Sequence, residues 1–76
     1  MTALCATGKS NLDGVTSMYL WSYGNYRYEI EVTKNSYFSE SEVFESSYEE
    51  ALNKFRNMVD KAILVNPPIV PGAKAL

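Results

Sequence analysis

The side chains with the greatest capacity for chemistry in this 76-residue chain are seven glutamates within one stretch of 22 residues. Lys34 supplies the one positive charge within that stretch. Paired carboxylates can act as general acid and base, and clustered carboxylates can attract a basic partner. They can equally serve only to keep a small domain soluble. The seven residues are Glu29, Glu31, Glu40, Glu42, Glu45, Glu49 and Glu50.

The residues that would complete a catalytic or metal site are missing from this sequence. It contains no histidine and a single cysteine, Cys5, which we place in a loose N-terminal arm. Zinc sites need clustered histidine or cysteine ligands, and a thiol nucleophile needs a histidine as its base. A chain of this length also offers little mass for a deep pocket. We therefore predict that the protein is not an enzyme and that it binds no metal and no cofactor.

The N-terminal residues bear on a possible phosphate-binding motif and on the cellular compartment. Gly8-Lys9-Ser10 resembles the end of a phosphate-binding loop, but Ala3 stands where the motif needs its first glycine, so we reject it. A lone cysteine forms no disulfide within the chain, which favours the cytoplasm. No apolar run is long enough for a signal peptide or a membrane span, and we expect no membrane partner.

Hydrophobic periodicity predicts the elements that position the glutamates. Apolar and charged residues alternate over Tyr26–Thr33, the period of a half-buried strand. Thr16–Tyr23 reads as a strand before it, and Gly24-Asn25 as a two-residue antiparallel turn. That turn would place seven apolar residues on one face, which we assign to the core: Tyr19, Trp21, Tyr23, Tyr26, Tyr28, Ile30 and Val32.

A third strand is predicted over Phe38–Glu45. The cost of burying its glutamates decides which of its faces we assign to the core. A turn at Asn35-Ser36 turns Ser39, Ser41 and Val43 inward, while the other phase would bury two glutamates. Burying an unpaired carboxylate costs several kcal/mol, more than the roughly 1.5–3 kcal/mol that a buried phenylalanine contributes. We therefore expect the following side chains on the outer face: Phe38, Glu40, Glu42 and Phe44, although a bulge could return Phe44 to the core.

One helix follows the strands. Ser47 and Glu50 form a capping box, and apolar residues recur at spacings of three and four from Tyr48 to Ala62. The predicted fold is therefore α+β: a three-stranded antiparallel sheet with one C-terminal helix on one face, in the order β-β-β-α. We expect a flexible N-terminal arm over 1–14, a single domain over 15–64 and an extended tail over 65–76.

The outer sheet face is the candidate functional surface. In the predicted register Glu31 lies opposite Glu40 and Glu29 opposite Glu42, a repulsion that a contact surface would justify. The chain has a net charge of −2 and a pI near 4.9, which disfavours phosphate binding and favours a basic partner. The candidate partner-binding residues are Met18, Leu20, Glu29, Glu31, Phe38, Glu40 and Glu42.

The segment Val43–Leu52 resembles a pattern in short phage-encoded proteins. In this pattern a strand ends in an aromatic residue, a serine caps the helix and the sequence "EEAL" opens it. That resemblance covers residues 17–63 and is architectural. It implies an acidic, non-catalytic inhibitor in the host cytoplasm that occupies the nucleic-acid-binding surface of a host or defence protein. The element order is also similar to arm-type DNA-binding domains of phage integrases, whose sheets are basic where this one is acidic.

Three functional hypotheses remain open at this point. The first is a protein-binding inhibitor that uses the acidic sheet face. The second is a nucleic-acid module that stacks bases on Trp21 and the tyrosines, if these are not the core. The third is a structural homo-oligomer, such as a homodimer, that pairs through the open sheet face or a free edge strand.

Overall fold

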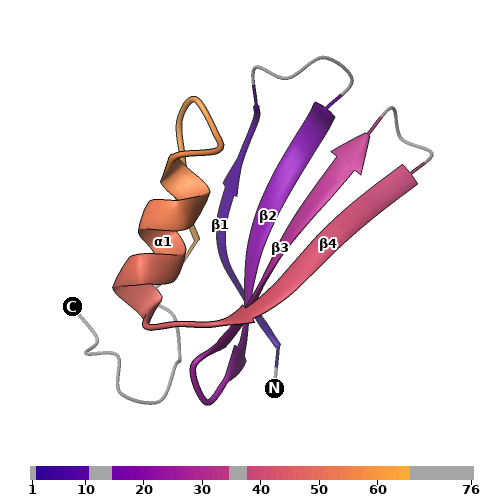
Figure 1. Cartoon of the computed structure of the whole chain (residues 1–76). Helices are drawn as coiled ribbons and strands as arrows, with labels where there is room; N and C mark the ends of the chain where they lie inside the picture. Colours follow the sequence, from indigo (N-terminus) through magenta and orange to yellow (C-terminus); the bar gives the residue numbers. More distant parts are fainter. Residues whose placement is uncertain (1, 11–14, 35–37, 66–76) are drawn as a thin grey trace.

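The computed structural model describes residues 2–10, 15–34 and 38–65, which form an antiparallel sheet and one helix. The α+β class with a helix on one face is therefore confirmed, but the sheet has five strands rather than three. Their order is β4-β3-β2-β1-β5, and α1 lies on one side of the sheet (Figure 1). The elements are β1 (Ala3–Gly8), β2 (Val15–Gly24), β3 (Arg27–Lys34), β4 (Phe38–Glu45), α1 (Tyr48–Arg56) and β5 (Ile63–Leu64).

The turn between β2 and β3 lies one residue later than predicted. Asn25 and Tyr26 carry positive φ angles of 53° and 61°, the geometry of a type I′ hairpin turn. Gly24, with φ of 82°, pairs with Arg27, and the register shifts between Ser22 and Gly24. A glycine suits this position because residues with a side chain rarely adopt such a φ. The hairpin therefore contains a bulge that the two-residue turn at Gly24-Asn25 did not include.

The bulge reverses the buried face of β2. Moving the turn by one residue changes the pairing by two residues, and the extra residue of the bulge reduces the net change to one. Leu20 pairs with Ile30 and Ser22 with Tyr28, and all four are buried beneath the helix. The prediction for β3 was right, because Tyr28 and Ile30 do face the core. The prediction that β2 buries its aromatic residues was wrong, since those lie opposite Glu29 and Glu31 on the other face. Both faces of β2 carry large apolar residues, so the pattern alone did not choose between them, and the side with Met18, Leu20 and Ser22 is the buried one.

The predicted phase of β4 is also wrong. Lys34 pairs with Phe38, which sets Glu42 opposite Ile30 and Phe44 opposite Tyr28, on the helix side of the sheet. The carboxylates are not buried there, because β4 is the edge strand. The Glu42 side chain is 63% exposed, and its Oε1 lies 2.7 Å from the Lys54 Nζ of α1. The assumption that every residue on the helix side is desolvated fails at the edge of a sheet.

The predicted N-terminal arm contains strand β1 instead. β1 pairs with β2 and with β5, and Cys5 and Ala6 are fully buried. The register shifts between Leu4 and Ala6, so Cys5 occupies a bulge and faces the core. Burial raises the pKa of the Cys5 thiol. Of the predicted C-terminal tail, Val65 donates its backbone N–H to the Cys5 carbonyl, and 66–76 lies outside the described residues.

The helix begins as predicted and ends earlier. Ser47 is the N-cap, and its Oγ accepts from the backbone N–H of Glu50 at 3.2 Å. α1 ends at Arg56 rather than Ala62, and the residues it buries are Ala51, Leu52 and Phe55. Beyond it, the chain turns back so that Val59 approaches Gly8 of β1. A Cβ on Gly8 would lie 2.9 Å from Val59 Cγ1, so glycine permits this close contact.

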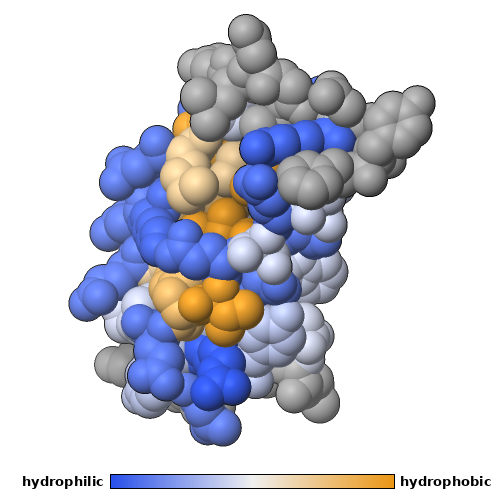
Figure 2. Space-filling model, turned by 45° about the vertical axis from the view of Figure 1, so that its right-hand side comes forward, coloured by the Kyte–Doolittle hydropathy of each residue, from blue (hydrophilic) through white to orange (hydrophobic). Residues whose placement is uncertain are grey.

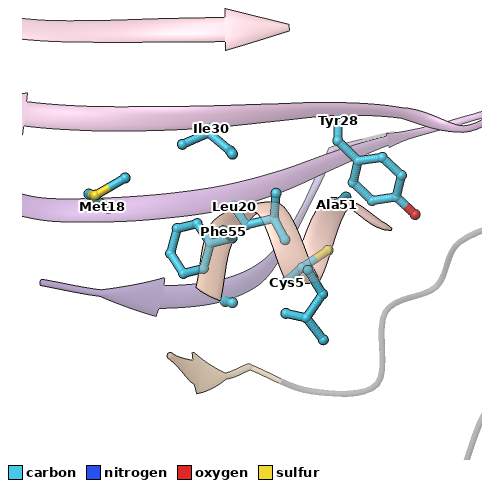
Figure 3. Packing of buried hydrophobic residues seen from close by; sticks show 9 residues of the cluster. Cys5, Met18, Leu20, Tyr28, Ile30, Ala51 and Phe55 are labelled. Atoms are coloured by element: carbon cyan, nitrogen blue, oxygen red, sulfur yellow. The ribbon is translucent and has the colours of Figure 1, made fainter. Parts of the chain in front are cut away.

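Figure 3 shows the core between α1 and the sheet, with Phe55 of the helix directed toward Leu20 and Met18 of β2. Tyr28 lies at the end of this cluster, near Ala51. Its hydroxyl is buried and makes no hydrogen bond of ordinary geometry among the described residues. Burial is the main cause that raises the pKa of Tyr28, although the neighbouring Ser22 hydroxyl opposes it. An unpaired buried hydroxyl destabilises the fold.

Replacement of Tyr28 by phenylalanine is therefore expected to stabilise the protein by about 1 kcal/mol in urea unfolding. The raised pKa means that the folded state holds the Tyr28 proton more tightly than the unfolded chain. The stability that comes from this tighter proton binding is fully present below about pH 10, and it is lost as the pH rises through the Tyr28 pKa of the folded state. Tyr28→Phe should consequently flatten the decline of stability above pH 10. A loss of stability at neutral pH would contradict this account.

Candidate functional site

The sheet face opposite α1 is not covered by any described element (Figure 1). We call it the open face. It carries an aromatic row on β2, two glutamates on β3 and smaller side chains on the neighbouring strands. An uncovered sheet face usually carries polar residues on alternate positions, so the aromatic content is unusual. Its central residues are Leu4, Thr7, Tyr19, Trp21, Tyr23, Glu29, Glu31, Ser41 and Val43.

The aromatic row occupies alternate positions of β2. Tyr19, Trp21 and Tyr23 are each half-buried, so each keeps part of its ring in contact with solvent. The ring centroids of Tyr19 and Trp21 lie 6.4 Å apart at an interplanar angle of 40°, within the range of favourable aromatic pairs. Val43 on β4 is 54% exposed and extends the apolar surface beyond the glutamates. The row thus forms a solvent-accessible apolar ridge across the middle of the sheet.

Diagonal hydrogen bonds tie the row to the glutamates of β3. Trp21 Nε1 donates to Glu31 Oε1 at 2.9 Å, and the Tyr23 hydroxyl donates to Glu29 Oε1. The bond to the Glu29 carboxylate raises the pKa of Tyr23, and partial burial and the charge of Glu31 act in the same direction. Both carboxylates are therefore held in fixed orientations at the surface by the aromatic side chains.

The two pairs of glutamates differ in their partners. Glu40 and Glu42 each lie within salt-bridge distance of a lysine, Lys34 at 3.2 Å and Lys54 at 2.7 Å respectively. Among the described residues no lysine or arginine lies within 4.0 Å of the Glu29 or Glu31 carboxylates. Glu29 and Glu31 therefore form no ion pair among the described residues, although Arg27 lies on the same face two residues from Glu29. They lie beside aromatic rings whose faces attract cations.

Of the seven predicted partner-binding residues, the structure places two on the open face, Glu29 and Glu31. Met18 and Leu20 are buried in the core, so they cannot contact a partner. Glu40 and Glu42 lie on the helix side. Phe38 begins β4 opposite Lys34, and its side chain lies outside what the structure describes. The expected repulsion across strands is also absent, because Glu31 pairs with Ser41 and Glu29 with Val43.

The residues that the sequence analysis missed at this surface are Tyr19, Trp21 and Tyr23, which it assigned to the core. Their common signal was present in the sequence: three large amphipathic rings at alternate positions, each with a polar tip. Such rings are enriched at interfaces because one end is apolar and the other forms hydrogen bonds. The register, in which Trp21 pairs with Glu29 and Tyr19 with Glu31, shows that these rings lie on the open face.

Comparison of the chain with protein families, with curated proteins and with solved structures found no match. In residues 2–10, 15–34 and 38–65, no group of three or more cysteine, aspartate or glutamate side chains is arranged to hold a metal ion. The described part of the chain likewise contains no helix with the length and apolar character needed to cross a membrane.

Proposed function

We propose that this protein is a small, non-enzymatic binding module that docks its open face on a basic surface of a partner protein. The observation that carries this proposal is the juxtaposition of Tyr19, Trp21 and Tyr23 with two carboxylates that form no ion pair among the described residues. Aromatic residues supply most of the binding energy in many interfaces, and complementary charge accelerates the encounter and selects the partner.

Preorganisation favours this use of the surface. Binding normally costs about 0.5–1.5 kcal/mol for each flexible side chain that becomes immobilised. Glu31 and Glu29 already accept hydrogen bonds from Trp21 and Tyr23, so part of their rotamer freedom is lost before any partner arrives. An arginine or lysine side chain of the partner would meet oriented carboxylate oxygens next to an aromatic ring, a favourable setting for a guanidinium group.

The resemblance to short phage-encoded proteins suggests the class of partner. We propose a host or defence protein whose basic surface otherwise binds nucleic acid, so that occupation of that surface inhibits it. The protein would then act in the cytoplasm of the host cell. Under this proposal its negative surface imitates the charge of a nucleic acid and its aromatic row supplies the desolvated contact.

Trp21 is the single tryptophan of the chain, so its fluorescence reports directly on the open face. We expect a ten-residue arginine-rich peptide to change Trp21 emission at 50 mM salt, and the effect to weaken steeply at 300 mM salt because exposed charges are screened. A matched peptide with glutamine in place of arginine is the control. An arginine-rich peptide that leaves the emission unchanged would contradict the proposal.

A second candidate function follows from the outward orientation of the aromatic row. Single-stranded nucleic acids stack their bases on such rings, at about 1–3 kcal/mol per base. The carboxylates beside the rings oppose it, because phosphates need positive charge nearby. An oligothymidine titrated against Trp21 in the same buffer separates the two functions. Salt-sensitive quenching by the oligonucleotide, without quenching by the peptide, would favour the nucleic-acid module.

A further inference from the structure

The outer edge of β4 is a second surface with a distinct geometry. β4 is the last strand in the order and pairs with β3 alone, over eight consecutive residue pairs without a register shift. No described element lies along its other edge (Figure 1). Figure 2, turned to bring that side forward, shows hydrophobic residues in the middle of the surface with hydrophilic residues around them. A regular, uncovered edge strand is a template for another strand.

Backbone alternation identifies the groups that face outward. The Ser46 N–H donates to the Tyr26 carbonyl at 2.9 Å, in register with the pair formed by Tyr28 and Phe44. Hydrogen-bonded pairs recur at every second residue of an antiparallel ladder. The even-numbered residues of β4 therefore bond to β3, while Ser39, Ser41 and Val43 direct their N–H and C=O groups away from it.

The two edges of this sheet differ in how they are protected from pairing with another strand. On the opposite side, β1 contains the bulge at Cys5 and is covered by β5, through Ala6 with Leu64 and Thr7 with Ile63. Bulges and covering strands are common devices against unwanted strand pairing. β4 has neither a bulge nor a covering strand among the described residues, and its sequence contains no proline, glycine or lysine. Glutamates are the one protective feature it carries.

Those glutamates argue against a second copy as the occupant. In an antiparallel pair of two β4 strands, a two-fold axis at Ser41 sets Glu40 opposite Glu42 of the other copy, twice. An axis at Glu42 or at Glu40 sets that residue opposite itself. An axis at Val43 or at Ser39 avoids these pairs, but it joins only Ser41–Glu45 or Phe38–Glu40 of β4 with the other copy. Like charges directly opposite each other destabilise a sheet. Each carboxylate contacts one lysine of this chain, Lys34 or Lys54, yet the two are 55% and 63% exposed. A strand with positive side chains at the same positions would therefore find them accessible.

We propose that the β4 edge accepts an extended segment of a partner protein, with lysine or arginine at alternate positions, as a sixth antiparallel strand. Its basic side chains lie opposite Glu40 and Glu42, at pairs that do not exchange hydrogen bonds and in which side chains approach most closely. Its backbone bonds to Ser39, Ser41 and Val43. This mode supplies affinity through the main chain and specificity through alternate side chains. It uses the main-chain edge of β4, whereas the open face uses side chains, among them those of Ser41 and Val43.

A nine-residue peptide of alternating lysine and valine tests this proposal, with the same peptide carrying glutamate for lysine as the control. Ser41→Pro removes an outward N–H that β3 does not use, a position where an edge strand tolerates proline. We expect Ser41→Pro to weaken binding of the lysine peptide at least tenfold. The matched Ser41→Ala variant should bind it as the unaltered protein does.

Amide hydrogen exchange provides a measurement that does not depend on the folding of Ser41→Pro. The lysine peptide should slow exchange at Ser41 and Val43 of the unaltered protein by at least tenfold. Unchanged exchange at these amides, or equal binding of the glutamate peptide, would overturn the proposal. Self-association of the protein through β4, seen as a dimer in light scattering that Ser41→Pro abolishes, would overturn the choice of a basic partner strand.

Discussion

Replacement of Leu20 by asparagine is expected to unfold the protein, whereas the same replacement at the adjacent Trp21 should leave it folded. Leu20 is fully buried against the helix. Its truncation costs about 2–5 kcal/mol, and an unsatisfied buried amide adds about 1–3 kcal/mol. That sum is comparable to the whole stability of a domain of this size. Trp21 lies on the open face, so Trp21→Asn loses only the contacts that the ring makes with neighbouring side chains on the sheet surface.

Circular dichroism with urea unfolding measures both variants, with tyrosine fluorescence as a second probe where Trp21 is absent. The comparison distinguishes the two possible hairpin registers. With the turn at Asn25-Tyr26 and the bulge between Ser22 and Gly24, Leu20 belongs to the core. With a turn at Gly24-Asn25, Trp21 would belong to it instead. A folded Leu20→Asn variant beside an unfolded Trp21→Asn variant would show that the faces of β2 are assigned in reverse.

The second large effect concerns binding through the open face. Trp21→Ala and the double variant Glu29→Gln/Glu31→Gln should each weaken binding of the arginine-rich peptide by about 2 kcal/mol or more, roughly thirtyfold. Trp21→Ala removes the central ring, and the double variant removes the charge of the two carboxylates that form no ion pair within the described part of the chain. Because Trp21 is the fluorescent reporter, isothermal calorimetry replaces fluorescence for the alanine variant.

A matched control exists on the helix. Glu49→Gln/Glu50→Gln changes the net charge by the same amount but lies in the first turn of α1, on the other side of the sheet. If binding depends on the open face, this control keeps nearly full affinity. If it loses as much affinity as Glu29→Gln/Glu31→Gln, overall charge rather than a defined surface governs binding, and the proposed docking face is wrong.

The parts of the fold that the sequence predicted correctly are those in which several local signals agree. Alternation in β3 indicated which face was buried, and the Ser47 cap with the following apolar stripe located the start of α1. Strand β1 gave no such signal. Its residues are small, its register contains a bulge, and its buried members Cys5 and Ala6 are adjacent rather than alternate. A strand of that kind is recognised only through its partners β2 and β5.

The candidate site was predicted in part, and the missing part depends on one residue of register. The face on which Glu29 and Glu31 lie was predicted correctly, because β3 has one apolar face. The face of the aromatic row was not, because the bulge between Ser22 and Gly24 changes the register by one residue and so exchanges the preceding side chains of β2 between the two faces. Tyr26 at φ 61° illustrates the difficulty. A tyrosine is uncommon in the left-handed region, so local propensity favoured the glycine-containing turn over the one that forms.

The most direct test of the central claim, that Trp21 faces outward beside Glu31, is quenching of its fluorescence by ions of opposite charge. Relative to its quenching of a free tryptophan derivative, caesium should quench Trp21 more strongly than iodide does at low ionic strength, because the neighbouring carboxylates attract the cation and repel the anion. Glu29→Gln/Glu31→Gln should reduce that difference. Emission at short wavelength that neither ion quenches would place Trp21 in the core and contradict the account.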